Sequence, residues 1–266
     1  MSRFTHNGMP DQLGIWRVGR TLQKSDRFVV SLCQPVDAGH DRRWDYAIKY
    51  PASHTTEAVI EINQAIAASS VVSHPNLVPV LDGCVTDRQA FLVMPFLPGR
   101  SMQWHLDHGP AKPLPVALWL VRQTAQALAV MHEAGWSHGD VKPENIVVAD
   151  NGHATLIDLG FAADCSQPNG SVFRGTPEYA APELLSNAAP QSFASDVFAL
   201  GRVLWQWLIA SDVDDESILG PIVEMVEWMV AESPSKRPDA SDVARKLLRM
   251  EIDTLGHHIG PQRRAA

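Results

Sequence analysis

The sequence predicts an α+β protein of two lobes, a small β-rich N-terminal lobe and a larger α-helical C-terminal lobe. The first third is rich in β-branched and aromatic runs, whereas the rest carries apolar residues at helical spacing. A Pro-Gly break in "LPGR", residues 97–100, separates the two parts. We expect a lead-in over residues 1–14, a domain over 15–255 with lobes 15–97 and 98–255, and a tail over 256–266.

The elements of the first lobe follow from local pattern. The runs "RFVVSLCQPV" and "WDYAIKY" predict strands, and "DAGHDRR" between them predicts a turn. Residues 55–72 predict a helix, because Val59, Ile62 and Ile66 form an apolar stripe. The segment "NLVPVLDGCVTDRQAFLVMPFL" then predicts two more strands.

The second lobe is predicted to be helical. "VALWLVRQTAQALAVMHEAG" has an apolar face, and Gly135 is a natural C-terminal stop. "DVFALGRVLWQWLIA" predicts a second amphipathic helix, and "SDVARKLLRM" a last one.

Bulk properties exclude several classes. A net charge of −8 and a pI of about 5.7 disfavour a nucleic-acid partner. The three cysteines lie far apart, which favours free thiols in a reducing compartment, and the N-terminus lacks the apolar core of a signal peptide. Arg122 and Arg202 interrupt the longest apolar stretches before the ~18–20 residues of a membrane span. We therefore expect a cytoplasmic protein without membrane insertion.

One constellation of polar residues suits phosphoryl transfer. That reaction depends on positioning and charge neutralisation, because negative charge spreads over the transferred oxygens. Asp140 would orient the acceptor hydroxyl, and Asn145 and Asp158 would offer hard oxygen ligands to Mg²⁺. Lys142 would meet the transferred phosphate and Lys49 the α and β phosphates. The apolar runs around "ADNG" predict a hairpin that carries Asp158 back towards Asn145.

Four strings carry a family resemblance: "YAIK" at 46–49, "HGDVKPEN" at 138–145, "DLG" at 158–160 and "GTPEYAAPE" at 175–183. In order and interval they resemble the eukaryotic-like (bacterial Hanks-type) serine/threonine protein kinases, from about residue 16 to about residue 250. "HPNLV", "LVMPFLPG", "SDVFALG" and "SKRP" add to this, and together the strings are specific. The resemblance implies a two-lobed protein kinase-like fold, ATP and Mg²⁺ as cofactors, and a protein hydroxyl as acceptor.

The resemblance also implies roles for single residues. Asp140 looks like the proton acceptor, Lys142 like the Lys typical of serine/threonine kinases, and Thr176 like the Thr that contacts both. Asn145 and Asp158 look like the Mg²⁺ ligands. The residues implied to bind the nucleotide are Lys49, Glu61, Leu22, Val30, Ala47, the gatekeeper Met94, the hinge residue Leu97, Asn145 and Asp158.

Three further residues are implied to be structural. Glu183 and Arg237 resemble the buried ion pair that ties the activation segment to the helical lobe, and Asp196 resembles the Asp that braces the catalytic loop. The interval from Asp196 to Arg237 is short for the family, so the substrate-docking helix is expected to be reduced. Leu159 stands where the family has Phe, and its reach is similar.

The glycine-rich loop of the family lacks its glycines. "QKSD" at 23–26 stands where two are expected. Glycine lets backbone amides approach phosphate closely, so its loss is expected to weaken ATP binding unless Ser25 or Lys24 contacts phosphate. Glu61 is the acid expected to pair with Lys49. Glu57, one helical turn earlier, is the alternative, and if neither acid reaches Lys49, catalysis is expected to be slow.

Gly139 stands where the family usually has the Arg that binds a phosphorylated activation loop. This replacement marks a non-RD type. Without that cation, loop phosphate has less to bind. The chain is therefore expected to need no activating phosphorylation, and Ser171 is the loop residue that tests this.

Two other functions stay open. A pseudokinase or nucleotide-gated binding module fits the missing glycines. A small-molecule phosphotransferase fits "HGD" followed five residues later by Asn, although such enzymes lack "GTPEYAAPE" and generally Lys142. Taken singly, Lys49 would be a solvated strand end, Asp140 a turn residue and His138 a core histidine. The signalling partner is not identified by the sequence.

Overall fold

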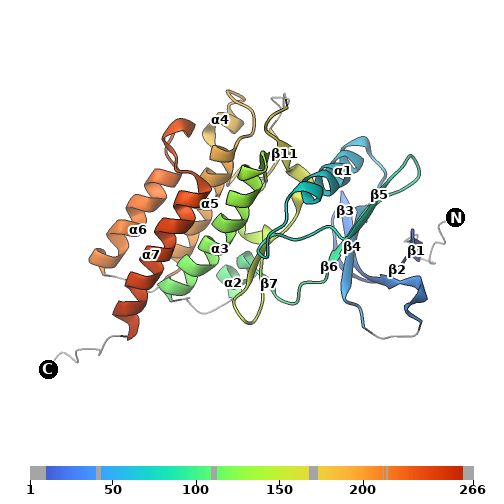
Figure 1. Cartoon of the computed structure of the whole chain (residues 1–266), viewed down its shortest axis with the longest axis horizontal. Helices are drawn as coiled ribbons and strands as arrows, with labels where there is room; N and C mark the ends of the chain where they lie inside the picture. The colour runs from blue at the N-terminus through green and yellow to red at the C-terminus, as the bar shows by residue number, and fades with distance from the viewer. Residues whose placement is uncertain are drawn as a thin grey trace. The chain divides into compact units, whose positions relative to one another are not determined.

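The computed structural model describes residues 10–39, 43–108, 113–167, 173–211, 213 and 215–259, and the chain divides into two compact units (Figure 1). The first, here the sheet unit, comprises Met1–Ser73, Val78–Pro98 and Asp158–Phe161. The second, here the helical unit, comprises His74–Leu77, Gly99–Ile157 and Ala162–Ala266. The main division lies one residue beyond the expected boundary between 97 and 98. Two short segments are exceptions to it: His74–Leu77 belongs to the helical unit, and Asp158–Phe161 belongs to the sheet unit.

The sheet unit contains a six-stranded antiparallel sheet in the order β1-β2-β3-β4-β6-β5. Its strands are rich in the β-branched and aromatic residues that fit a pleated, half-buried surface. The strands are β1 (Gln12–Leu13), β2 (Trp16–Lys24), β3 (Phe28–Pro35), β4 (Tyr46–Pro51), β5 (Asp82–Val85) and β6 (Ala90–Pro95).

The two faces of this sheet differ because side chains alternate along each strand. One face holds an apolar core made of Leu13, Trp16, Val29, Cys33, Ile48, Tyr50, Phe91 and Val93. Lys49 lies between two of these core residues on β4, so it belongs to the opposite face, together with its cross-strand partners Val30 and Leu92.

Strand β1 lies inside the segment 1–14 that the sequence predicts to be a lead-in. Leu13 is only 6% exposed and joins the apolar core, and it pairs with Trp16 of β2. The expectation was wrong for these residues, because a two-residue strand is too short for an alternation pattern to reveal.

Helix α1 (Thr56–Val71) coincides closely with the helix predicted over 55–72. Thr55 caps its N-terminus, since the Thr55 side chain accepts a hydrogen bond from the backbone N–H of Ala58. The buried side, which includes Ile62, packs against the 3₁₀ turn η3 (Leu159–Phe161). This packing explains why that short segment belongs to the sheet unit.

In the helical unit, helix α3 lies beside α5 and α7, and α6 contacts α5 and α7 (Figure 1). Each buries an apolar stripe, as expected for amphipathic helices in a core. The helices are α2 (Met102–His108), α3 (Leu114–Glu133), α4 (Pro182–Leu185), α5 (Phe193–Ile209), α6 (Glu216–Met229) and α7 (Ala240–Ile259).

Two helices differ from the prediction. Helix α6 is not among the predicted helices. It contains Gly220-Pro221, a pair that usually interrupts a helix, and Asp215 caps it by accepting from the backbone N–H of Ser217. Helix α7 continues to Ile259, beyond the expected start of the tail at residue 256. Thr254 is buried on its last described turns.

Short strands complete the helical unit. The predicted hairpin is present as β9 (Ile146–Val148) paired with β10 (Ala154–Leu156), and β7 (Arg100–Ser101) adds to it. A second pair joins β8 (Trp136–Ser137) to β11 (Ala163–Asp164). Helix α3 ends at Glu133, and Gly135 follows with φ +85°, a left-handed conformation that favours glycine.

By length and composition alone, α3 would qualify as a membrane span, so Arg122 does not exclude it as the sequence suggested. Two thirds of that window, 67%, is buried within the protein. Arg122 itself forms an ion pair with Glu251 of α7, with 2.7 Å between Nε and Oε2. Packing in the core of the helical unit therefore accounts for the apolar character of α3.

Candidate active site

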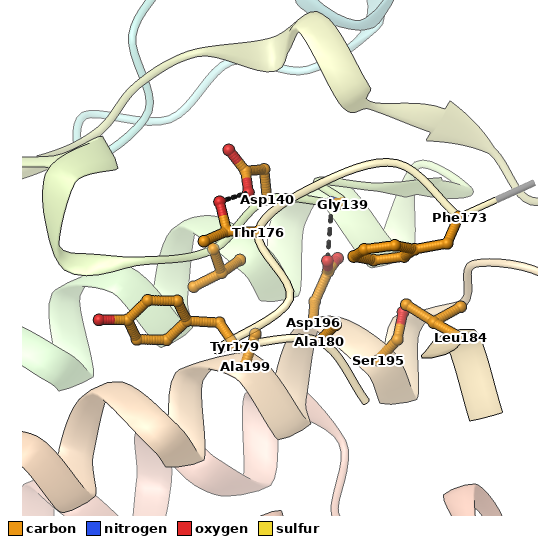
Figure 2. A pocket seen from close by; sticks show the side chains of 11 residues that line it. Gly139, Asp140, Phe173, Thr176, Tyr179, Ala180, Leu184, Ser195, Asp196 and Ala199 are labelled. Carbon is orange, nitrogen blue, oxygen red and sulfur yellow. Dashed lines mark hydrogen bonds between the residues drawn. The ribbon is translucent and has the colours of Figure 1, made fainter. Parts of the chain in front are cut away.

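The loop that carries Asp140 is held by a buried carboxylate of α5. Asp196, 1% exposed, accepts a hydrogen bond from the backbone N–H of Gly139 at 2.9 Å (Figure 2). It also accepts from the backbone N–H of His138 at 2.7 Å. The Nε2 of His132 lies 3.0 Å from the same carboxylate. These bonds fix the backbone immediately before Asp140, the bracing role that the resemblance implies for Asp196.

Gly139 has a conformational reason to be glycine. Its φ is +81°, in the left-handed region that other residues adopt at a cost and glycine adopts freely. The residue that departs from the family pattern thus lets the loop present both amides to Asp196 without backbone strain.

Asp140 forms a closed hydrogen-bonded group with Lys142 of the same loop and with Thr176 from a later segment. Thr176 Oγ1 donates to Asp140 Oδ1 at 2.8 Å, and Lys142 Nζ donates to Thr176 Oγ1 at 2.6 Å. Lys142 Nζ also lies 2.8 Å from Asp140 Oδ2. The Thr176 side chain points at the Asp140 carboxylate in Figure 2. Each of the three side chains therefore orients the other two.

Asn145 is oriented by Asp140. Its Nδ2 donates to the backbone oxygen of Asp140 at 2.9 Å and to Oδ2 at 3.0 Å. Because the amide nitrogen serves these two bonds, the amide oxygen is the atom that Asn145 can offer to a cation. A hard oxygen ligand of this kind suits Mg²⁺.

A small cavity of about 20 Å³ lies beneath Asp140 and Thr176, and Phe173, Tyr179 and Asp196 are among its lining residues (Figure 2). A single water needs about 10–15 Å³ of such volume, so the cavity has room for little more than one water.

The segment from Thr176 onwards is anchored by the buried ion pair that the sequence predicts. Arg237 Nη1 and Nη2 donate to the two carboxylate oxygens of Glu183, at 2.6 and 2.8 Å. Glu183 lies in α4, and its side chain is 8% exposed, while that of Arg237 is fully buried. Arg237 also donates to the backbone oxygens of Ala194, Ala231 and Glu232. The prediction of this pair is confirmed.

In the sheet unit, Lys49 and Asp158 form an ion pair, with 2.6 Å between Nζ and Oδ1. Asp158 has φ +66°, an uncommon conformation for a residue with a side chain, and its Oδ1 also accepts from the N–H of Gly160 at 3.2 Å. Local strain at a charged residue of this kind is typical of functional sites. Lys49 Nζ lies 4.4 Å from the centre of the Phe28 ring.

Some of the residues implied to surround adenine lie on the same face of the sheet as Lys49. Ala47 pairs with Met94, and Lys49 pairs with Val30, so these four belong to one face. Ala47 is buried and Met94 half-buried. Leu97 lies beyond the end of β6 and is half-buried, whereas Leu22 on β2 is 37% exposed.

Glu61 does not pair with Lys49 as the sequence predicts. Its carboxylate forms an ion pair with Arg27, and Lys49 pairs with Asp158 instead. Burial raises the pKa of Glu61, the positive charges of Arg27 and Lys49 lower it, and Asp158 raises it. Lys49 therefore acts on Glu61 electrostatically while bonded elsewhere, and the choice of Glu61 as its bonded partner was wrong for this conformation.

The segment without glycines forms a tight turn between β2 and β3. Ser25 Oγ accepts from the backbone N–H of Arg27 at 3.3 Å and of Phe28 at 3.1 Å, and Ser25 N–H donates to the oxygen of Phe28 at 2.9 Å. Two amides that could face a phosphate are thus bonded within the turn. Lys24 is exposed at the end of β2.

Each unit thus gathers one part of the predicted site. The helical unit brings Asp140, Lys142, Asn145 and Thr176 into one hydrogen-bonded group, and the sheet unit brings Asp158 and Lys49 together. The oxygens of Asn145 and Asp158 match the hard-ligand chemistry of Mg²⁺. The described residues also include two that sequence reasoning missed, Arg27 beside Glu61 and His132 beside Asp196.

Comparison with known proteins gives a consistent result. Residues 38–249 match the family model "Protein kinase domain". The chain is 32% identical over 213 residues to the serine/threonine-protein kinase PkaA of Streptomyces coelicolor, covering 70% of this chain and 39% of that protein. It is 26% identical over 221 residues to the cAMP-dependent protein kinase type 3 of Saccharomyces cerevisiae, covering 82% and 55%. Against the serine/threonine-protein kinase Sgk1 of Danio rerio it is 32% identical over 184 residues, covering 66% and 40%.

These alignments span from about two fifths to just over half of the relatives' own lengths. The family model covers most of this chain, including the Asp140 group, Asp158 and the pair of Glu183 with Arg237. The chain therefore belongs to the protein kinase family, among the eukaryotic-like serine/threonine protein kinases.

Proposed function

We propose that this chain transfers the γ-phosphate of ATP to serine or threonine hydroxyls of a protein substrate. The observation that carries the proposal is the closed group of Asp140, Thr176 and Lys142. A carboxylate held by two neighbours is preorganised to orient an acceptor hydroxyl, and preorganisation is the main contribution a protein makes to phosphoryl transfer.

The proposed step uses these side chains as follows. The acceptor hydroxyl donates to Asp140 while its oxygen attacks the γ-phosphorus, and its proton passes to the Asp140 carboxylate as the new bond forms. The bond from the γ-phosphorus to the bridging oxygen breaks, and ADP leaves. Lys142 neutralises charge on the transferred group, and Lys49 holds the non-transferred phosphates once it exchanges Asp158 for them.

Asn145 and Asp158 are the residues proposed to hold Mg²⁺, which would neutralise phosphate charge when bound. Lys49 would then lose its present partner to the metal and become available for phosphate.

We also propose a non-RD type of control. Gly139 offers no cation to a phosphorylated loop. Asp196 holds the backbone N–H groups of His138 and Gly139, and Arg237 holds the Glu183 carboxylate, through bonds that need no phosphate. Ser171, the residue whose replacement by Ala tests this, lies outside the described residues. Full activity of Ser171→Ala is the expected result, and an inactive variant would contradict it.

One specific observation favours a second candidate, a pseudokinase or nucleotide-gated binding module. Glu61 is bonded to Arg27 and not to Lys49, and the turn beside it bonds its own amides. A measurement of thermal stability with and without millimolar Mg-ATP tests whether the chain binds nucleotide, because a ligand of the native state raises apparent stability. No shift would favour a binding module that does not use nucleotide.

The test of the proposed function is transfer of radiolabel from γ-labelled Mg-ATP. Wild type is expected to label itself or a generic protein substrate on serine or threonine, and Lys49→Met is expected to reduce this strongly. Reactions with an aminoglycoside and with choline form the comparison arms. Label on either small molecule and none on protein would replace the proposal with a small-molecule phosphotransferase.

We also propose that the protein is cytoplasmic. The free state of Cys33, Cys84 and Cys165 supports a reducing compartment. Burial raises the pKa of Cys33 to about 12, so this thiol stays protonated and unreactive.

A further inference from the structure

The turn between β2 and β3 is built by one side chain. The Ser25 hydroxyl accepts from the N–H groups of Arg27 and Phe28, at 3.3 and 3.1 Å. Hydroxyl-to-backbone bonds of this kind stabilise tight turns in place of glycine. The cost is that these amides point at the Ser25 oxygen, and a phosphate would have to compete with that oxygen for them.

A second hairpin of the same sheet repeats this turn. In "TDRQ", Thr86 Oγ1 accepts from the N–H groups of Arg88 at 3.4 Å and Gln89 at 3.2 Å, as Ser25 does in "SDRF". Both turns therefore place an arginine at the same position of the same local structure. Arg88 is exposed, and the turn conformation alone gives neither arginine a function.

Arg27 differs from Arg88 in what lies around it. Its guanidinium pairs with the buried carboxylate of Glu61 and lies 6.0 and 5.8 Å from the ring centres of Phe28 and Phe161. Lys49 lies over the same Phe28 ring at 4.4 Å and pairs with Asp158. Two cations and two carboxylates thus form one cluster, with Arg27 at its outer end, where its side chain is 51% exposed.

We propose that Arg27 binds the phosphates of the nucleotide, supplying through its side chain the contacts that a glycine-rich turn supplies through its backbone. The inference rests on the proposed function. On binding, Arg27 leaves Glu61 for phosphate, and Lys49 leaves Asp158 and takes Glu61 as its partner while also contacting phosphate.

The chemistry of the cluster supports this exchange. A guanidinium carries a fork of donors that matches phosphate oxygens in pairs, which a compact ammonium cannot do. Arg27 is half-exposed on a turn, so its side chain can move without disturbing the core. Glu61 is not left unpaired, because the charge of Lys49 already acts on it in this conformation. The two carboxylates and two cations balance each other before the anionic ligand arrives.

The experiment is nucleotide binding by titration calorimetry, with Mg²⁺, for ATP, ADP and adenosine. Arg27→Ala is compared with wild type and with the matched control Arg88→Ala, which removes the same side chain from the same kind of turn in the same sheet. We expect Arg27→Ala to weaken ATP and ADP about tenfold and adenosine less than twofold, since the lost contact is a charge-assisted bond from a half-exposed group. Arg88→Ala is expected to match wild type for all three ligands.

Arg27→Gln covers the case in which Arg27→Ala is too unstable to measure. It keeps a donor for Glu61 but removes the cation, and the same phosphate-dependent loss is expected. Wild-type affinity for ATP in Arg27→Gln, or tighter ATP binding in Arg27→Ala, would overturn the inference. Arg27 would then make no contact with phosphate, or would only hold the Glu61 carboxylate in place. If wild type binds ATP and all variants bind equally, the inference fails and the proposed function stands. If wild type binds no nucleotide, both fail.

Discussion

Replacing Glu183 by Gln should destabilise the helical unit strongly. The change keeps the shape of the side chain but leaves the Arg237 guanidinium, which is fully buried, without its counter-charge. Three backbone oxygens still accept from Arg237 and hold it in place, so the charge cannot move to solvent. Breaking one partner of a buried pair typically costs about 3–5 kcal/mol of unfolding free energy.

The magnitude follows from how completely this pair is buried. In a protein of this size, 1 kcal/mol lowers the melting temperature by about 2–4 °C, so Glu183→Gln is expected to lower it by about 10 °C. The matched control is Asp242→Asn, which breaks the pair of Asp242 with Arg245 on α7. Its side chains are 38% and 64% exposed, and exposed helix pairs contribute about 0.3–0.5 kcal/mol.

The assay is thermal unfolding followed by circular dichroism, with both variants measured in the same buffer. A fall in melting temperature of under 2 °C for Glu183→Gln, or an equal fall for Asp242→Asn, would contradict this prediction. In either case the buried pair would not be what anchors the segment after Thr176.

Three further outcomes are expected. Thr176→Ala removes the bridge between Lys142 and Asp140 and should lower kcat about tenfold to a hundredfold, whereas Thr176→Ser, which keeps the hydroxyl, should stay near wild type in a radiolabel transfer assay. Each oxygen of Asp196 accepts from one backbone N–H group, so Asp196→Asn replaces one of these acceptors with a donor and should cost about 1–3 kcal/mol by denaturant unfolding. Burial raises the folded-state pKa of Glu61, so its contribution to stability is present below the unfolded pKa and is lost as pH rises through the folded pKa. Wild type should therefore lose unfolding free energy relative to Glu61→Gln between pH 4 and pH 7.

Each of these outcomes has a clear opposite. Equal loss in the Ala and Ser variants of Thr176 would show that the hydroxyl is not the bridge. An Asp196→Asn protein as stable as wild type would mean that the loop amides find another acceptor. A difference between wild type and Glu61→Gln that does not change with pH would show that burial of Glu61 leaves its pKa unshifted.

The sequence predicts those parts of the fold that depend on repeating patterns. Helices α1, α3 and α5 lie where apolar periodicity indicates them, and β3, β4 and β6 lie where β-branched and aromatic runs occur. It does not predict β1, whose two residues carry no pattern, or α6, in which Gly220-Pro221 reads as a break. Tertiary packing of Ile222, Met225 and Met229 overrides that local signal.

For the site, motif spacing finds the residues but not their partners. The bonds of Thr176 with Asp140 and Lys142 follow from matching positions, as does the pair of Glu183 with Arg237. The ion-pair partner of Glu61 does not follow from matching positions. Both Arg27 and Lys49 act on its carboxylate, and motif spacing does not tell which of them forms the ion pair. The turn built by Ser25 decides it, since that conformation brings Arg27 over Glu61.

The most direct test of the account is single-turnover transfer by Asp140→Asn at saturating Mg-ATP, with ATP affinity measured on the same protein. Asn keeps the size of Asp140 and can still accept from Thr176, but it cannot take the proton of the acceptor hydroxyl. We expect unchanged ATP affinity and a transfer rate at least about a hundredfold below wild type. A variant that transfers phosphate to protein at the wild-type rate would contradict it.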